Sequence, residues 1–321
     1  MRRLLDINDT YCLRGIAMLM IIISHTFNGY PVGSADVYYP SWMNWLHMEL
    51  WGGMGVAVFL FLSGYGLFTT LSQKQRIDWR YISSKGIRLF EPYIIYWIVE
   101  IIVLAIFCRE EISTHLLTEI ATFSIHPDAE NWFFKVIVVF YVIMLLLFRV
   151  HLQNAVRMTI VSLLSIVSLL IMKELGFGQW WWNNILCFPL GMLFAYKYQF
   201  FSGLPSHIVS LSSGALLLTV YNIHMNTIVF HLVFAVFCIY TLKLVNIQSR
   251  LLYFIGFNCF IFYFIECPVM DTIMMFAYPN FPVYSLLSVL GTFILSYLCI
   301  QCSKQIKSQG IGRAHNKRVK S

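Results

Sequence analysis

Long apolar runs recur along the whole chain, and they limit its fold more than any other feature. A helix that crosses the hydrocarbon core of a bilayer needs about 20 mostly apolar residues, with a range of roughly 17 to 25. Ten runs match this pattern: 13–30, 51–71, 89–107, 132–148, 156–172, 180–196, 208–223, 228–244, 251–269 and 283–300. We therefore predict an all-α, polytopic membrane bundle of about ten transmembrane helices.

Composition supports the membrane assignment. Of the 321 residues, 59% are hydrophobic and 12% are charged, whereas soluble domains carry about 25% charged residues. Because so few polar side chains cannot cover a globule of this size, much of the surface must face lipid. The net charge of +7 would suit nucleic acid, but the basic residues lie between the apolar runs, as in membrane proteins. We predict membrane lipid as a partner and no nucleic acid.

The distribution of basic residues predicts the orientation. With a cytoplasmic N-terminus, ten spans leave all but three of the 22 Lys and Arg residues in inner segments, the exceptions being Arg109, Lys135 and Lys173. This bias toward the cytoplasm is the usual determinant of topology. We predict that both termini are cytoplasmic and that the protein is a multi-pass protein of the plasma or inner membrane. Residues 1–321 form one domain, with a basic cytoplasmic tail from about residue 303.

The eight cysteines predict neither a metal site nor a disulfide framework. Nearly all of them fall inside apolar runs, where cysteine behaves as a small hydrophobic residue. Cys299 and Cys302 have a C-x-x-C spacing, but a second pair of ligands with metal-binding spacing is missing from the sequence.

Ionisable residues inside the apolar runs are candidates for function, because burying them in a membrane is costly. The first run carries two on one helix face, Arg14 and His25. They are eleven residues apart (25 − 14 = 11), which leaves about 20° after three turns and separates them by roughly 16 Å along the axis. A cation at the cytoplasmic rim and a deep imidazole suit an anionic ligand and proton abstraction near neutral pH. The alternative is a hydrogen-bonded histidine and an arginine that only follows the charge bias.

Lys85 and Arg88 lie three residues apart at the entrance to the third run, and therefore on one helix face. Together with Arg14 they have the chemistry to bind phosphates, Arg through its bidentate fork and Lys as a point charge. The alternative is a solvated cytoplasmic loop without a ligand.

Five stretches occur in an order that is typical of one family. They are Arg14 and His25 with ten residues between them, the 58–65 stretch with Leu62-Ser63-Gly64, the 85–88 stretch followed by Pro92-Tyr93, Asn131-Trp132-Phe133-Phe134, and Phe188-Pro189-Leu190-Gly191. The ordered set, which extends over nearly the whole chain, resembles the acyltransferase-3 family of integral-membrane acyltransferases. The resemblance implies transfer of an acyl group, most often acetyl, from cytoplasmic acyl-coenzyme A to a hydroxyl of an outward-facing carbohydrate.

The resemblance also implies roles for particular residues. His25 would be the general base, with a covalent acyl-imidazole step as an open alternative. The phosphates of acetyl-CoA would be held by three basic residues: Arg14, Lys85 and Arg88. Ser63 and Asn28 would hydrogen-bond the imidazole or an oxyanion, or else serve only in helix packing.

The sequence departs from the family pattern at two positions. The basic pair is usually Arg at both positions, whereas Lys85 is the first here. The segment 255–268 resembles one that commonly ends in Tyr, two apolar residues, His and Pro, and Glu266 stands where that His is expected. We place Glu266 in the catalytic site, while a non-essential position remains the alternative.

A rival from another class is a transporter or flippase of lipid-linked glycans, with Glu100, His231 and Glu266 as a proton relay. The sequence has no visible inverted repeat of the kind that transporters use. Aromatic clusters at 38–42 and 180–182 suit membrane interfaces, although such rings also stack on sugars. We expect acceptor recognition in the outer loops 31–49 and 108–131.

Overall fold

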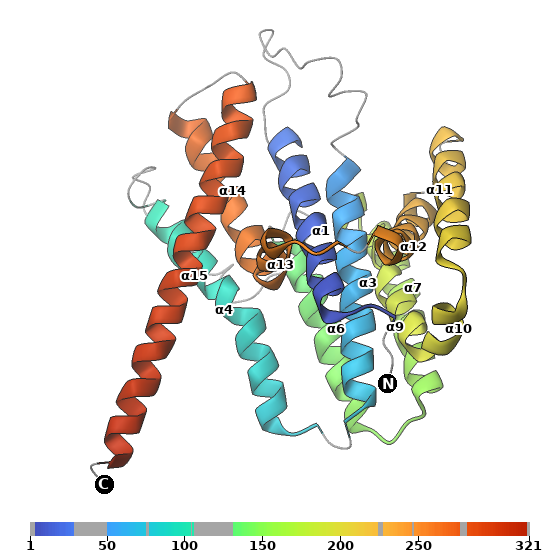
Figure 1. Cartoon of the computed structure of the whole chain (residues 1–321), viewed down its shortest axis with the longest axis horizontal. Helices are drawn as coiled ribbons and strands as arrows, with labels where there is room; N and C mark the ends of the chain where they lie inside the picture. Colours follow the sequence, from blue (N-terminus) through green and yellow to red (C-terminus); the bar gives the residue numbers. More distant parts are fainter. Residues whose placement is uncertain are drawn as a thin grey trace.

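The computed structural model describes residues 4–28, 50–74, 77–103, 105, 131–223, 227–245, 247–276 and 281–319. This part of the chain is helical and contains no β-strand. Figure 1 shows the arrangement. The helices are α1 (Ile7–Asn28), α3 (Trp51–Ser72), α4 (Trp79–Val103), α6 (Trp132–Arg149), α7 (Asn154–Glu174), α8 (Gln179–Trp182), α9 (Cys187–Tyr196), α10 (Tyr198–Gly203), α11 (Ser206–Asn222), α12 (Thr227–Val245), α13 (Arg250–Phe257), α14 (Cys259–Phe276) and α15 (Phe281–Val319).

Six of the described helices are long and apolar enough to cross a membrane: α1, α3, α6, α7, α12 and α15. The helix pair α13 and α14 makes a seventh if it counts as one span, although its two parts are bent by 80°. The all-α membrane fold is thereby confirmed, while the number of ten spans and the position of the termini stay predictions.

Two expected spans are not continuous helices. Residues 180–196 form α8, a turn and α9, and the ten residues of α9 extend only about 15 Å, half the hydrocarbon thickness of about 30 Å. Residues 251–269 are divided at Asn258, whose side-chain amide donates to the Phe254 carbonyl at 2.8 Å. Ile261 N–H then donates to the Asn258 carbonyl at 2.9 Å and starts α14 in a new direction.

Helix α3 lies at the centre of the bundle, where it contacts α1, α6, α9 and α12. In its most apolar window, 78% of the residues are buried, the largest share among the candidate spans. A helix that is hydrophobic on all sides is typical of a core position. Figure 1 shows α3 between α1 on one side and α12 on the other.

Glycines allow the closest helix contacts, and they lie in the stretches that the sequence comparison emphasised. A Cβ atom at Gly64 on α3 would overlap the Phe188 carbonyl, and one at Gly191 on α9 would overlap the Phe61 carbonyl. Helices α1 and α13 have a matching pair, because a Cβ at Gly15 or at Gly256 would overlap backbone of the opposite helix. Small residues permit this close backbone approach in membrane bundles.

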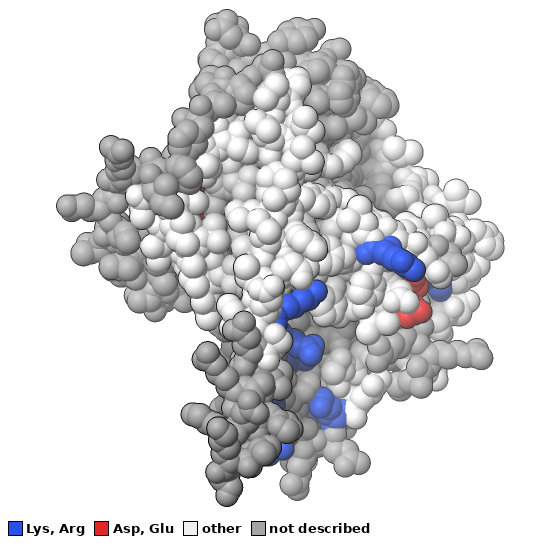
Figure 2. All heavy atoms as spheres, turned by 60° about the vertical axis from the view of Figure 1, so that its left-hand side comes forward, with Lys and Arg blue, Asp and Glu red and all other residues white. Residues whose placement is uncertain are grey.

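Helix α15 continues past the expected start of the tail at residue 303, through Val319. Near this point it is tied to α4. Glu91 accepts hydrogen bonds from Lys307 Nζ at 2.7 Å and from Ser303 Oγ. Figure 2 shows one face of the molecule, and most of the basic side chains visible there lie in its lower half. In Figure 1 the N-terminal end of α1 and the C-terminal end of α15 lie at that lower level.

Candidate functional site

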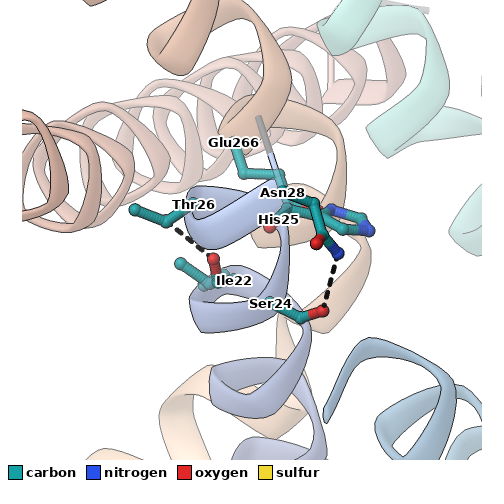
Figure 3. A network of polar contacts seen from close by, with 6 residues as sticks. All are labelled: Ile22, Ser24, His25, Thr26, Asn28 and Glu266. Carbon is teal, nitrogen blue, oxygen red and sulfur yellow. Dashed lines mark hydrogen bonds and ion pairs between the residues drawn. The ribbon is translucent and has the colours of Figure 1, made fainter. Parts of the chain in front are cut away.

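His25 and Glu266 are in direct contact, although 241 residues separate them. His25 lies in the last turn of α1, and Glu266 lies on α14 beyond the bend. The His25 Nδ1 and Glu266 Oε1 atoms are 2.7 Å apart. The glutamate side chain is fully buried, whereas the imidazole is 36% exposed. Figure 3 shows the two side chains approaching from their separate helices.

This contact determines which imidazole nitrogen is available for chemistry. With Glu266 ionised, Oε1 accepts and His25 Nδ1–H donates, so the Nε2 lone pair is left for a proton. A buried carboxylate behind the imidazole holds this tautomer and stabilises the imidazolium when it forms. The second oxygen, Glu266 Oε2, is also buried and has no hydrogen-bond partner in the described part of the chain. The pair has the arrangement of a general base with its positioning carboxylate.

The other polar residues at this end of α1 hold the helix rather than the imidazole. Thr26 Oγ1 donates to the Ile22 carbonyl at 2.7 Å, and Asn28 Nδ2 donates to Ser24 Oγ at 3.3 Å (Figure 3). Asn28 thus bonds to Ser24 in this structure, and its contact with an oxyanion stays a prediction. Residues i and i+4 lie over one another on a helix, so the Asn28 side chain lies over Ser24.

Arg14, Lys85 and Ser63 line one cavity of about 320 Å³. It lies at the opposite end of α1 from His25, between α1, α3, α4 and α6. Tyr11 and Tyr141 also line it, and the Arg14 guanidinium lies 5.8 Å from the centre of the Tyr11 ring. The sequence analysis did not single out these tyrosines. The sequence spacing could have identified Tyr11 as a neighbour of Arg14, because it lies three residues earlier on the same helix face.

The cavity is electropositive. Arg14 Nε is buried and has no hydrogen-bond partner among the residues that the structure describes. Burial lowers the pKa of the Lys85 ammonium from its usual range, and the cations of Arg88, Arg14 and Lys74 lower it further. The described residues that line the cavity include no carboxylate. An anionic ligand would reduce the repulsion among these cations and accept a hydrogen bond from the unpaired Arg14 Nε–H.

Arg88 and Ser63 differ from their expected positions. Arg88 is exposed and does not line the cavity, although its charge lowers the pKa of Lys85, which does. Ser63 lies at the Arg14 end and not beside the His25 imidazole. The reason is that α1 and α3 are antiparallel: Gly52 lies against Ser24 and Gly55 against Ala17, so Ser63 is displaced a further 12 Å or about eight residues toward the Arg14 end.

One possible metal-binding group occurs among the described residues. The ligand atoms of His25, Glu266 and Cys267 all lie within 4.8 Å of one another. Nitrogen, carboxylate and thiolate ligands suit zinc, but the hydrogen bond between His25 and Glu266 already occupies two of these atoms. A metal ion would have to displace the shared proton. The absence of a metal therefore stays a prediction.

The remaining sequence predictions concern the transport alternative and the outer loops. Of the proposed relay, Glu266 bonds to His25, while His231 lies against Gly53, on the α12 side of α3. The loops 31–49 and 108–131, where we expected acceptor recognition, lie almost wholly outside the described residues.

Comparison with known proteins identifies a family. A family model described as an acyltransferase domain matches residues 8–301, nearly the whole chain. Searches of curated proteins and of solved structures found no match. The matched region includes every candidate residue named above, at both ends of α1.

Proposed function

Because this chain belongs to the acyltransferase-3 family, we propose that it is a membrane O-acetyltransferase with His25 as the general base. The acyl donor is cytoplasmic acetyl-CoA, and the acceptor is a hydroxyl of a cell-surface or lipid-linked carbohydrate. The protein works in the plasma or inner membrane. The observation that carries this proposal is the 2.7 Å contact between His25 Nδ1 and the buried Glu266 carboxylate.

Donor binding is assigned to the electropositive cavity. Arg14 and Lys85 bind phosphate groups of acetyl-CoA there, and Arg88 adds to the attractive field from the exposed surface of α4. Ser63 lines the path toward the interior. Arg14 and His25 are roughly 16 Å apart along α1, so an extended donor is required to bring its thioester from the cations to the imidazole. The pantetheine arm of coenzyme A has this extended form.

Acyl transfer then needs one group that first removes a proton from the acceptor and later returns it to the leaving group. His25 Nε2 takes the proton of the acceptor hydroxyl, and the hydroxyl oxygen forms a bond to the thioester carbonyl carbon. The carbon–sulfur bond breaks, and the imidazolium returns the proton to the departing thiolate. Glu266 stabilises the imidazolium between these steps. The products are the acetyl ester and free coenzyme A thiol.

A covalent route uses the same residues in two steps. His25 Nε2 attacks the thioester to form an acyl-imidazole, which the acceptor hydroxyl then cleaves. Ping-pong kinetics, with thiol release before acceptor binding, would identify this route. Direct transfer requires both substrates to be bound before any thiol appears.

The first experiment compares purified wild-type protein with His25→Ala and with His207→Ala, which removes an exposed imidazole on α11. Acetyl-CoA binding, thiol release and acetyl transfer to extracted cell-surface glycans are measured. We expect His25→Ala to bind acetyl-CoA normally and to lose about 10²- to 10⁴-fold in transfer rate, while His207→Ala matches wild type. Absence of acetyl-CoA binding in wild type would overturn the donor assignment. Glycan movement without thiol release would indicate a transporter.

A further inference from the structure

A second cavity, of about 410 Å³, lies near the N-terminal end of α3. Its walls come from the start of α3, from α8 and the turn after it, from the end of α11 and from the start of α12. Its size falls within the range of small-molecule sites, roughly 300 to 1,000 Å³. Two of its lining residues were candidates from the sequence: His231 as a relay residue, and Trp180 within the aromatic cluster 180–182.

Three buried polar side chains line this cavity without using their full hydrogen-bonding capacity. Asn183, Asn184 and His231 are 6%, 2% and 8% exposed. Within the described part of the chain, Asn183 Oδ1, Asn184 Oδ1 and His231 Nδ1 have no hydrogen-bond partner. Each unsatisfied buried group costs about 1–3 kcal/mol. Three of them around one cavity indicate a ligand that supplies the missing partners.

The two amides are not needed to build the local turn. The turn between α8 and α9 is held by backbone hydrogen bonds, from Asn183 N–H to the Gln179 carbonyl at 3.0 Å and from Cys187 N–H to the Asn184 carbonyl at 2.9 Å. The side-chain amides are therefore free of a capping role. The sequence did contain a signal for this cavity, namely two adjacent amides, Asn183 and Asn184, inside an expected apolar span.

The chemistry of the walls selects a neutral ligand with hydroxyl groups. None of the described residues that line the cavity is Lys, Arg, Asp or Glu, in contrast to the cavity at Arg14. The unpaired amide oxygens accept hydrogen bonds, and the imidazole offers a further polar contact. Trp180 and Phe230 add aromatic faces, and the Phe230 ring lies 5.9 Å from the imidazole of His231. Buried amides with aromatic faces suit the alternating hydroxyl and C–H surfaces of a sugar ring.

Two adjacent glycines place this cavity at the same end of the bundle as His25. A Cβ on Gly52 would lie 2.9 Å from Ser24 Oγ, on the residue before His25, and a Cβ on Gly53 would lie 2.9 Å from His231 Nε2. Successive helix residues point about 100° apart. One turn of α3 thus packs against the catalytic end of α1 on one side and against His231 on the other.

We propose that this cavity binds a neutral glycosyl unit of the acceptor, with Asn183, Asn184 and His231 contacting its hydroxyls and Trp180 covering one face. The assignment rests on the proposed acetyltransferase function. It separates the two substrates: the anionic donor binds at the Arg14 end of α1, and the uncharged sugar binds at the His25 end.

The test measures sugar binding without the reaction. Wild type, Asn184→Leu, Trp180→Ala and His25→Ala are purified in a detergent without a sugar headgroup. They are titrated with methyl glycosides of glucose, galactose, mannose and N-acetylglucosamine, and with glucuronate as a charged comparison. Trp180 is 55% exposed, so its removal leaves the fold intact, and Trp79→Ala, at a 70% exposed position on α4, is the matched control.

We expect at least one neutral glycoside to bind wild type and His25→Ala equally. Asn184→Leu and Trp180→Ala should weaken that binding at least tenfold while leaving acetyl-CoA binding unchanged, and Trp79→Ala should have no effect. Absence of binding by the whole panel, stronger binding of glucuronate, or binding that neither cavity variant changes would overturn the proposal. Sugar binding that depends on Asn184, without any acetyl transfer by wild type, would instead retain the sugar site and reject the acetyltransferase function.

Discussion

At the residue scale, the contact between His25 and Glu266 gives the histidine a defined chemical role. A neutral imidazole can carry its proton on either ring nitrogen, whereas a buried carboxylate on Nδ1 makes Nε2 the basic atom. In the pattern that this sequence resembles, the position of Glu266 is commonly occupied by His. A carboxylate there supplies a negative charge that a neutral imidazole does not.

We predict that Glu266→Gln lowers kcat for acetyl transfer by about 10²-fold and leaves acetyl-CoA binding unchanged. Glutamine preserves the size of the side chain and can accept from Nδ1–H, but it does not stabilise the imidazolium. Steady-state kinetics with saturating donor, together with donor binding, would measure both effects. A kcat equal to that of wild type would show that Glu266 has only a packing role.

Arg14→Ala should weaken acetyl-CoA binding more than it slows chemistry. The variant removes a half-buried arginine whose buried Nε has no partner among the described residues, and a hydrogen bond to a charged group contributes about 1.5–3 kcal/mol. We expect Kd to rise by about 10- to 100-fold, with kcat within about threefold of wild type at saturating donor. Arg80→Ala, at an exposed site on α4, is the control. Equal donor affinity in Arg14→Ala would contradict the assignment.

The lowered pKa of Lys85 leads us to predict that donor binding depends on pH. Burial and the neighbouring cations lower the pKa of the free lysine, and a bound phosphate raises it because it favours the charged form. Affinity is therefore greatest below the pKa of the free protein and falls as the pH rises through that value. Lys85→Arg keeps its charge throughout, so its affinity should stay high at alkaline pH and its activity should be retained. Identical pH profiles of Kd would exclude Lys85 from the donor site.

At the element scale, glycine contacts fix how α3 packs against its neighbours. Gly64 and Gly191 each lie against a backbone carbonyl of the opposite helix, and Gly15 and Gly256 form the corresponding contact between α1 and α13. The contact of α1 with α13 also orients α14, which continues from α13 after the bend and carries Glu266. The helix that holds the carboxylate is thus positioned by packing at a distance from it.

Gly64→Ala should destabilise the protein by about 1–3 kcal/mol or more, because the added methyl group meets the Phe188 carbonyl. Gly66→Ala is the matched control on the same helix, since a Cβ at Gly66 has no heavy atom within 4 Å and alanine favours a helix over glycine by about 1 kcal/mol. Thermal unfolding in detergent should show a lower Tm for Gly64→Ala and an unchanged or higher Tm for Gly66→Ala. Equal Tm values would show that α3 and α9 can separate without cost.

At the scale of the whole molecule, the two cavities lie at opposite ends of α1 and differ in charge. The one at Arg14 contains two cations and the one near Gly53 contains no charged lining residue among those described. Basic side chains on the face in Figure 2 also gather toward the Arg14 end. This polarity agrees with a cytoplasmic Arg14 end and an outward-facing His25 end.

The short helices α8 and α9 leave open whether residues 180–196 cross the membrane. We predict that Leu175 lies outside and Ser202 inside, since ten spans place them on opposite faces. Both positions are exposed. In a background with Cys108 of the expected outer loop and the exposed residues Cys267 and Cys302 replaced by Ser, an impermeant thiol reagent on intact cells should label Leu175→Cys, and Ser202→Cys only after lysis. Labelling of both in intact cells would make α8 and α9 a re-entrant segment and reduce the number of spans.

The properties that depend on neighbouring residues along one helix could be predicted from the sequence alone. The membrane class follows from the length of the apolar runs, and the shared face of Arg14 and His25 follows from helix periodicity. The family resemblance, confirmed over residues 8–301, rests on the order of short motifs. The membrane class, the shared helix face and the family resemblance each depend on residues that are close together in the sequence, and not on how the helices pack.

Which distant groups meet became known only from the packing of the helices. The pairing of His25 with Glu266 depends on the 80° bend at Asn258, which apolar periodicity does not reveal. The antiparallel packing of α1 and α3 moved Ser63 to the donor cavity. The turn after α8 exposed Asn183 and Asn184 to a cavity from within an expected continuous span. In each case contacts across helices set the outcome, because a hydrogen bond or a close backbone approach depends on three-dimensional distance and not on separation along the chain.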